Sequence, residues 1–299
     1  MTDRRDALKC LGVGAGTLFT LSGGVFSAFD LAQAQPVTGT PLFLQISDTH
    51  IGFNKEANPD VVGTLNRTID TVNALPHQPA LVLHTGDVTH LSKASEFDSA
   101  SQLLSRLKAG ELHVVPGEHD VTDGPGAEFF ARFGKASGNK GYYSFDAQGV
   151  HFVALVNVMN FKPNGLGALG PDQLAWLKDD LSGRSASQPI VVFAHMPLWT
   201  IYEPWGWGTG EGEEIAALLR RFGSVTVLNG HIHQIVQKVE GNILFHTARS
   251  TAYPQPAAGS APGPGPLLVP PAQLPGMLGV TVAVRGRKNA LALSDSTLV

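Results

Sequence analysis

Acidic and histidine side chains follow the apolar runs of this 299-residue sequence at five places. A carboxylate or imidazole at one such place is usually a hydrogen-bonded structural group, but five runs that all end this way are hard to explain by structure alone. Mixed carboxylate and imidazole donors suit Zn, Fe or Mn better than Ca or a thiolate-bound cluster. The pattern therefore indicates a transition-metal site. The residues are Asp48, His50, Asp87, Glu118, His119, Asp120, His195, His231 and His233.

The densest of these places is the stretch at residues 114–121, with the sequence V-V-P-G-E-H-D-V. The mostly apolar residues 112–115 suit a short buried strand, and the Pro-Gly pair that follows should end it. The next three residues bring a carboxylate, an imidazole and a second carboxylate to the loop at the strand's carboxyl end. Ligands of open α/β sheets bind at that edge.

The elements that must position these groups have a regular order in the first half of the chain. Apolar runs at residues 42–47, 80–85 and 112–115 predict buried parallel strands. Apolar residues at helical spacing predict a helix after each of the first two strands. A β-α-β-α-β order favours a parallel half-sheet with right-handed crossovers, which brings the strand ends to one edge. The predicted helices cover residues 59–72 and 97–107.

The second half predicts more strands, joined by shorter connections, with two helices between them. The helix at residues 171–181 begins with proline, a favoured first residue, and the helix at 211–222 is stopped by a glycine. Two of the strands present histidines at their ends, as the first half does. The predicted strands cover residues 142–146, 151–157, 190–194, 224–228, 237–239, 243–247, 280–285 and 290–293.

Composition and charge fit a globular enzyme with a small-molecule substrate. With 43% hydrophobic and 15% charged residues, the chain can bury a sizeable core. A net charge of -4 and the lack of a basic stripe argue against a nucleic-acid partner. The Pro/Gly-rich segment at about residues 254–275 is interpreted as a loop inside the domain, because too few residues follow it to form another. The sequence leaves the oligomeric state open.

The first 34 residues resemble a signal peptide. Arg4 and Arg5 precede an uncharged stretch at residues 10–29, and an A-x-A cleavage sequence follows. The arginine pair resembles a twin-arginine signal, which predicts a periplasmic or secreted protein whose mature domain covers residues 35–299. A retained membrane anchor is the alternative, because the stretch is about long enough to span. Signal removal would remove Cys10, the only cysteine, and leave no stable membrane span.

The motifs D-x-H, G-D, G-x-H-D, H-x-P and G-H-x-H, in this order, resemble those of the calcineurin-like metallophosphoesterases. The match runs from about Leu42 to His233. The resemblance implies an α/β fold in which a β-sandwich of mixed sheets is flanked by helices, in four αββα layers. It also implies two divalent or trivalent transition metal ions (Fe, Mn or Zn) and hydrolysis of phosphoesters by a metal-bridging hydroxide. Two such cations lower the pKa of a shared water and stabilise the charge of the in-line transition state.

The resemblance implies a role for most of the strand-end residues, with one departure. The family usually has Asn where this chain has Glu118, so that a ligand of the second metal gains a negative charge. This charge should reduce Lewis acidity and disfavour an approaching phosphate dianion. The alternative function is therefore an exported metal- or phosphate-binding protein with little or no turnover. The matched positions are Asp48, His50 and His233 for the first metal, Asp87 for the bridge, His195 and His231 for the second metal, and His119 for the catalytic histidine.

Three further residues near the motifs are weaker candidates. Asp120 could orient the catalytic His119 or could cap the local backbone. His90, three residues after the bridging aspartate, is a candidate substrate contact. Arg249 is a candidate ligand of a phosphate oxygen.

An aromatic segment follows His195. Trp199 and Tyr202, with Trp205 and Trp207 close behind, could form one wall of a substrate pocket or could pack only against one another. Because this segment is aromatic and little Lys or Arg stands near the motifs, a phosphodiester substrate is favoured over a phosphomonoester.

Overall fold

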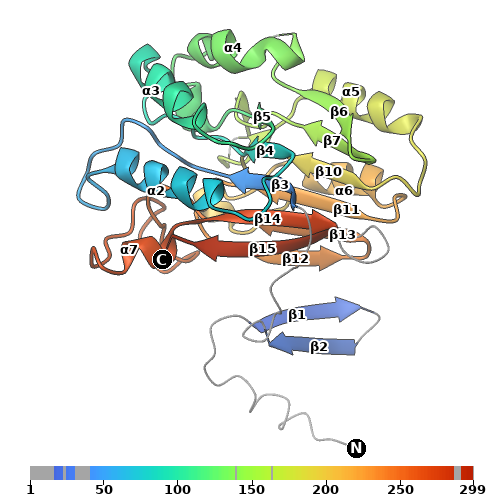
Figure 1. Cartoon of the computed structure of the whole chain (residues 1–299). Coiled ribbons are helices and arrows are strands. Elements are labelled where there is room, and N and C mark those ends of the chain that lie inside the picture. The colour runs from blue at the N-terminus through green and yellow to red at the C-terminus, as the bar shows by residue number, and fades with distance from the viewer. Residues whose placement is uncertain are drawn as a thin grey trace, which may run out of the picture. The chain divides into compact units, whose positions relative to one another are not determined.

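The strand ends that carry the acidic and histidine residues belong to two mixed sheets (Figure 1). The computed structural model describes residues 17–22, 25–30, 41–138, 140–162, 164–285 and 291–298. Residues Met1–Val37 and Thr38–Val299 form separate units, so each is described by itself. Within the described ranges, no helix has both the length and the apolar character needed to cross a membrane.

The first sheet of the larger unit has five strands. In spatial order they are β15 (Leu291–Thr297), β14 (Gly279–Arg285), β3 (Pro41–Ile46), β4 (Leu81–His84) and β5 (Glu111–Val114). β3, β4 and β5 are parallel, whereas β14 runs antiparallel to β3 and β15 antiparallel to β14. The predicted parallel half-sheet is thus present, with the end of the chain added to its edge as a hairpin.

The second sheet has six strands. In spatial order they are β12 (Gln237–Glu240), β13 (Ile243–Thr247), β11 (Val225–Asn229), β10 (Ile190–Phe193), β7 (Val150–Ala154) and β6 (Tyr143–Ala147). The four central strands are parallel, and an antiparallel strand lies at each edge. The histidine-bearing ends of β10 and β11 are therefore neighbours.

Alternation along the strands shows why the two sheets pack against each other. Leu81 and Leu83 of β4 share one apolar layer with Val191 and Phe193 of β10. The intervening residue of β4, Val82, belongs instead to the layer beneath the helices. Since neighbouring strand residues point to opposite faces, each sheet has one face on its partner and one on helices.

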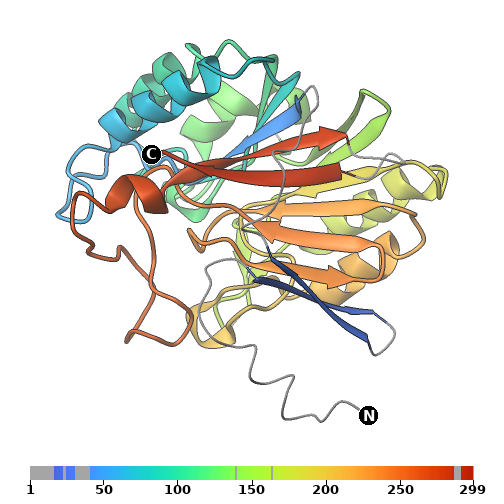
Figure 2. The same ribbon diagram turned by 60° about the horizontal axis from the view of Figure 1, so that its bottom comes forward.

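Helices cover the outer face of each sheet. α2, α3 and α4 pack on the five-stranded sheet, and α5 and α6 pack on the six-stranded sheet (Figures 1 and 2). This arrangement confirms the predicted four-layer αββα fold. The helices are α2 (Val61–Asn73), α3 (Ala94–Leu104), α4 (Ala127–Phe133), α5 (Pro171–Ser182) and α6 (Gly212–Leu219).

The observed elements follow the predicted order but differ in detail. α6 is shorter than the predicted helix at residues 211–222. α4 was not predicted, because seven residues rich in phenylalanine are too few to show a helical period. The remaining short elements are β8 (Asn160–Phe161), β9 (Gly167–Ala168), α7 (Leu274–Met277) and the 3₁₀ helices η2 (Glu118–Asp120), η3 (Gly134–Ser137) and η4 (Glu203–Trp205).

In the described part of the N-terminal unit, β1 (Thr17–Ser22) and β2 (Val25–Asp30) form an antiparallel pair. Both strands fall within the predicted signal peptide, and β2 ends one residue beyond its uncharged stretch, at Asp30. The arginine pair and the A-x-A sequence lie outside the described residues. The signal peptide and its cleavage site therefore stay predictions.

Candidate metal centre

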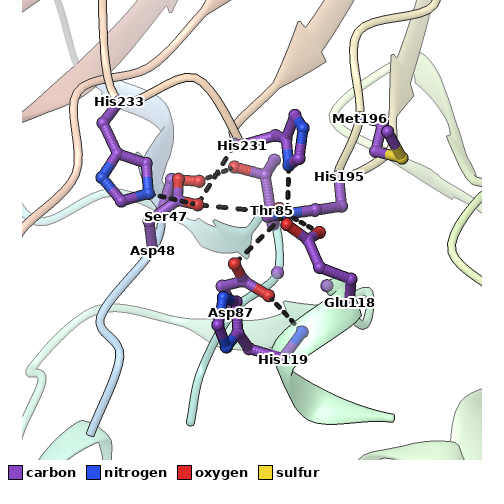
Figure 3. Close-up of polar contacts among 12 residues, drawn as sticks. Ser47, Asp48, Thr85, Asp87, Glu118, His119, His195, Met196, His231 and His233 are labelled. Atoms are coloured by element: carbon purple, nitrogen blue, oxygen red, sulfur yellow. Dashed lines mark hydrogen bonds and ion pairs between the residues drawn. The ribbon is translucent and has the colours of Figure 1, made fainter. Parts of the chain in front are cut away.

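All five strand-end segments meet at one edge of the two sheets (Figure 3). The segments after β3 and β4 are joined by backbone hydrogen bonds from Asp48 to Gly86 and from His50 to Asp87, at 3.0 and 2.9 Å. The segment after β11 joins them through the backbone N–H of His231, which donates to Asp48 Oδ1 at 3.1 Å. Residues far apart in the chain are thus fixed in one cluster.

The backbone at this edge adopts a conformation that side chains rarely favour. Five of the candidate ligands have positive φ angles, which place them in the left-handed region. Such conformations cost free energy and concentrate at functional sites, where the surrounding structure enforces them. The angles are 54° for Asp48, 42° for His50, 52° for Asp87, 69° for His231 and 55° for His233.

A first cluster of donor atoms consists of Asp48, His50 and His233. His233 Nε2 lies 3.2 Å from Asp48 Oδ1 and 3.2 Å from His50 Nε2. All three side chains are buried. Two imidazole nitrogens and a carboxylate oxygen that face one another at this spacing can bind a single transition metal ion.

A second cluster consists of Glu118, His195 and His231. Glu118 Oε2 lies 2.8 Å from His195 Nε2, and its Oε1 lies 2.9 Å from His231 Nδ1. The carboxylate therefore lies between the two histidines. A Glu at this position reaches the place that a ligand of a second ion would occupy.

Asp87 lies between the two clusters. Its Oδ2 is 3.5 Å from His50 Nε2 on one side and 3.4 Å from His195 Nε2 on the other. Its Oδ1 accepts a hydrogen bond from the backbone N–H of His119 at 2.9 Å. One carboxylate in contact with both clusters suits a bridging ligand.

The donor atoms fit metal ions better than a hydrogen-bonded network. Four of them are buried and have no hydrogen-bond partner with suitable geometry among the described residues, although potential partners lie close by. Buried polar atoms without partners are unfavourable unless a ligand or ion satisfies them. The atoms are Asp48 Oδ2, Glu118 Oε2, His195 Nε2 and His231 Nδ1.

Backbone carbonyls fix the orientation of two of the histidines. His195 Nδ1 lies 2.7 Å from the carbonyl of Thr85, and His233 Nδ1 lies 2.6 Å from that of Tyr253. With a proton on Nδ1 donated to each carbonyl, Nε2 is left as the free lone pair. This is the usual arrangement around metal-binding histidines.

Electrostatics differ between the two clusters. Burial, assisted by His233 and His119, holds the pKa of His50 well below its usual value, which favours the neutral form that binds metals. Burial also lowers the pKa of His195, but the carboxylates of Asp87 and Glu118 outweigh it, so that the pKa lies well above the usual value. This excess of negative charge beside His195 is suited to a cation.

His119 is held beside the clusters by His90. His119 Nδ1 lies 2.8 Å from the His90 carbonyl, and the two rings stack with centroids 4.7 Å apart. Burial lowers the pKa of His119, but Asp87 and Glu118 raise it more, so that the net shift is upward. A protonated His119 can donate a proton from Nε2 to a leaving group.

The contacts of Asp120 are those of a backbone-capping residue. Its carboxylate accepts hydrogen bonds from the backbone N–H groups of Gly117, Val88 and Thr89, at 2.8 to 3.0 Å. It therefore fastens η2 to the segment after β4. Burial and the nearby Asp87 raise its pKa to about 7.

A cavity of about 250 Å³ opens onto the clusters. Several of its lining residues belong to no sequence motif. They lie on loops and come near the site only when the chain is folded. Tyr253 lies beside the Pro/Gly-rich segment and Gln255 within it, and nothing else in the sequence marks them. The lining beyond the ligand candidates consists of Phe53, Lys55, His90, His119, Trp205, Trp207, Tyr253, Gln255, Pro264, Gly265 and Pro266.

Three of the predicted substrate contacts do not line this cavity. Trp199 packs against Phe245 in the core beneath the second sheet, with ring centroids 5.0 Å apart. Tyr202 contacts Trp205 but lies outside the lining. Arg249 has a contact with the carbonyl of Gly276 at 3.5 Å and is also outside it. His90, Trp205 and Trp207 are the predicted pocket residues that the structure brings to the cavity.

Comparison with known proteins agrees with the site geometry in pointing to a phosphoesterase. The calcineurin-like phosphoesterase family matches residues 41–235. A probable glycerophosphodiester phosphodiesterase from Arcobacter nitrofigilis is 25% identical over 223 residues, covering 71% of this chain and 79% of the relative. Purple acid phosphatase 23 from Arabidopsis thaliana is 27% identical over 225 residues, covering 60% of this chain and 48% of the relative, so the match spans about half of that protein.

Among solved structures, a dimetal phosphatase from Danio rerio has the same fold. Its TM-score is 0.65 at 15% identity, with 87% of this chain and 97% of that chain covered. The chain belongs to the calcineurin-like phosphoesterase family, and it is a hydrolase of phosphoesters.

Proposed function

We propose that this protein hydrolyses phosphoesters, with a preference for diesters, at a pair of transition metal ions held by the two clusters. The observation that carries the proposal is the position of Asp87 between two sets of donors that include four buried atoms without a suitable hydrogen-bond partner among the described residues. When bound, two such ions would activate a water and stabilise the charge of the transition state. Fe, Mn and Zn all suit these donors.

The residues around the ions supply the remaining chemistry. Asp48, His50 and His233 would hold the first ion, and Glu118, His195 and His231 the second. His119, oriented through its Nδ1 by the His90 carbonyl, would protonate the departing oxygen from Nε2.

The lining of the cavity supports the diester preference. Trp205, Trp207 and two prolines form an apolar part of the wall, and Lys55 is the one lysine or arginine in the described lining. A monoester dianion would gain from more cationic partners, whereas a diester has one negative charge and a second organic group to place. The printed name of the Arcobacter relative also specifies a phosphodiesterase.

The test uses metal-free protein reconstituted separately with Mn, Fe and Zn. Turnover of a bis-aryl phosphate faster than of the matching mono-aryl phosphate supports the proposal, and the reverse order contradicts the diester preference. Trp205→Ala should raise KM for the bis-aryl ester. Trp199→Phe, which alters an aromatic residue outside the cavity, is the matched control.

A binding protein with little turnover is the second candidate, and the placement of Glu118 favours it. Its charge lies 2.8 and 2.9 Å from atoms of His195 and His231, where it would weaken the Lewis acidity of the second ion. In the same assay, two bound ions per chain without hydrolysis of either ester would support this candidate and exclude the first.

We also propose that the chain is exported with a twin-arginine signal and acts in the periplasm or outside the cell. The sequence around Arg4 and Arg5 supports this. N-terminal sequencing of exported protein should find a start near Gln35. An exported chain that still began at Met1 would contradict cleavage and favour the retained anchor.

A further inference from the structure

We propose that the phenol oxygen of Tyr253 is a ligand of the first metal ion, beside Asp48, His50 and His233. The inference rests on the proposed metal centre and adds a donor that lies outside the family motifs. It places a phenol in the ligand set of a site otherwise formed by carboxylates and imidazoles.

The first argument is the spacing of the donor atoms. Tyr253 Oη lies 3.2 Å from His50 Nε2. The same nitrogen lies 3.2 Å from His233 Nε2 and 3.5 Å from Asp87 Oδ2. Two donors at right angles on one ion, each about 2.1 Å from it, are roughly 3 Å apart. Tyr253 Oη therefore lies as near to His50 Nε2 as the other donors of this cluster do.

The second argument is the direction of the side chain. The rings of Tyr253 and His50 stack with centroids 4.8 Å apart and an angle of 28° between their planes. Because the rings lie alongside each other and the hydroxyl contacts Nε2, the two donor atoms lie next to each other at the same end of the stacked pair. Tyr253 also lines the cavity that opens onto the clusters.

The third argument is that the backbone of Tyr253 is tied to two of the proposed ligands. Its carbonyl lies 2.6 Å from His233 Nδ1. Its N–H donates to Ser250 Oγ at 3.2 Å, and that hydroxyl donates to the carbonyl of Asp48 at 2.7 Å. The tyrosine is thus positioned by the same network that positions the first cluster.

The fourth argument is the fate of the hydroxyl when an ion binds. Tyr253 is 3% exposed, and the hydrogen bond of its hydroxyl among the described residues is with His50 Nε2. A metal ion would occupy the lone pair of that nitrogen and leave the buried hydroxyl without an acceptor, which is unfavourable. Coordination by the same ion gives the oxygen a partner. On such coordination the O–H bond would break, an oxygen–metal bond would form and the proton would pass to solvent.

The other tyrosines cannot supply this ligand. The chain has four, and all lie in described segments. Tyr142 packs on Trp176, Tyr143 has its hydroxyl 3.3 Å from His113 Nδ1, and Tyr202 packs on Trp205. A phenolate signal from bound metal would therefore come from Tyr253.

The experiment titrates the metal-free full chain with ferric iron as the probe and records the visible spectrum. Phenolate bound to ferric iron has an intense charge-transfer band that carboxylate and imidazole do not give. The band should appear in the wild type and in the control Tyr142→Phe. It should be absent from Tyr253→Phe, whose affinity for the first ion should also fall by about tenfold or more.

Each outcome decides the proposal. Wild-type protein that binds iron without the band, or Tyr253→Phe that keeps it, would overturn the inference and leave the proposed function intact. Wild-type protein that binds no metal would overturn the proposed function itself. If Tyr253→Phe does not fold, resonance Raman spectroscopy of the ferric wild type gives the answer instead, because phenolate vibrations must appear there.

Discussion

The two clusters of donor atoms face each other across Asp87, but they differ in exposure. Side chains of the first cluster are buried, with 0% exposure for Asp48 and 1% for both histidines. In the second cluster, Glu118 is 30% exposed and His231 13%. Both clusters contribute to the cavity lining, but Glu118 and His231 of the second cluster are more exposed than any residue of the first, while His195 is buried.

The clusters also differ in how their geometry is enforced. All three residues of the first cluster have positive φ angles, whereas in the second cluster His231 has one but Glu118, which lies in a 3₁₀ helix, and His195 do not. Gly86, beside Asp87, shows how tightly the edge is packed, because an added Cβ would lie 2.5 Å from His195 Nδ1. The difference suggests that the first site is set by the backbone and that the second can be tuned by side chains.

Loss of the shared carboxylate should have the largest effect, because it belongs to both clusters. Asp87→Ala should lose both ions and reduce turnover to background. Elemental analysis of the purified variant, with the wild type prepared in parallel, measures this. A variant that kept two metals per chain would show that the clusters are independent sites.

Loss of His119 should reduce turnover without loss of metal. His119→Ala should cost about 10²- to 10⁴-fold on esters with poor leaving groups, the usual range for general acid catalysis. On an activated aryl ester the loss should be smaller, because a leaving group of low pKa departs without a proton. The measurement is the slope of rate against leaving-group pKa. Equal loss on every ester, or release of a metal, would assign His119 another role.

A matched pair of variants tests the difference in burial directly. His50→Ala and His231→Ala each remove one imidazole. Each variant should lower the affinity for one of the two ions by about 10- to 100-fold or more. In metal-free protein, His50→Ala should cost about 2 to 4 kcal/mol of unfolding free energy, as buried truncations do. His231→Ala should cost about 1 kcal/mol or less. Denaturant unfolding with chelator present measures both, and equal costs would remove the distinction between the clusters.

The sequence predicts the chemistry of this edge well because the chemistry is local. Each strand-end motif, such as Asp48-Thr49-His50, contains both the signal that ends the strand and the donor atoms that follow. Hydrophobic period and element order then predict the parallel half-sheet, whereas the two-sheet layering was implied by the family resemblance. These features need no knowledge of which strands are neighbours.

The rest of the site depends on contacts between distant segments. Tyr253 reaches His50 across 203 positions of the chain, and no motif marks it. Trp199 and Trp205 are both tryptophans of the same aromatic segment, yet Trp199 packs on the core and Trp205 lines the cavity. Likewise, only the fold shows that the carboxylate of Asp120 accepts hydrogen bonds from backbone N–H groups.

The smallest expected effect concerns Glu118, the residue that most separates the second cluster from the first. If its charge reduces the Lewis acidity of the second ion, Glu118→Asn should keep both ions but change the metal preference. The variant should also have a higher kcat/KM for an anionic diester. Removal of one unit charge about 4 Å from the substrate anion is worth roughly 1 kcal/mol in a water-like dielectric, or about fivefold.

Glu118→Gln separates the effect of charge from that of length, since it removes the charge and keeps the side chain's reach to His195 and His231. If charge dominates, both variants should accelerate hydrolysis to a similar degree. If length dominates, Glu118→Asn should differ from the wild type and Glu118→Gln should not. Kinetics on one bis-aryl ester, together with metal content after loading with Mn, Fe and Zn, distinguish these outcomes. Unchanged kinetics and unchanged metal content in both variants would show that Glu118 is no ligand, and the second ion would then depend on His195, His231 and Asp87 alone.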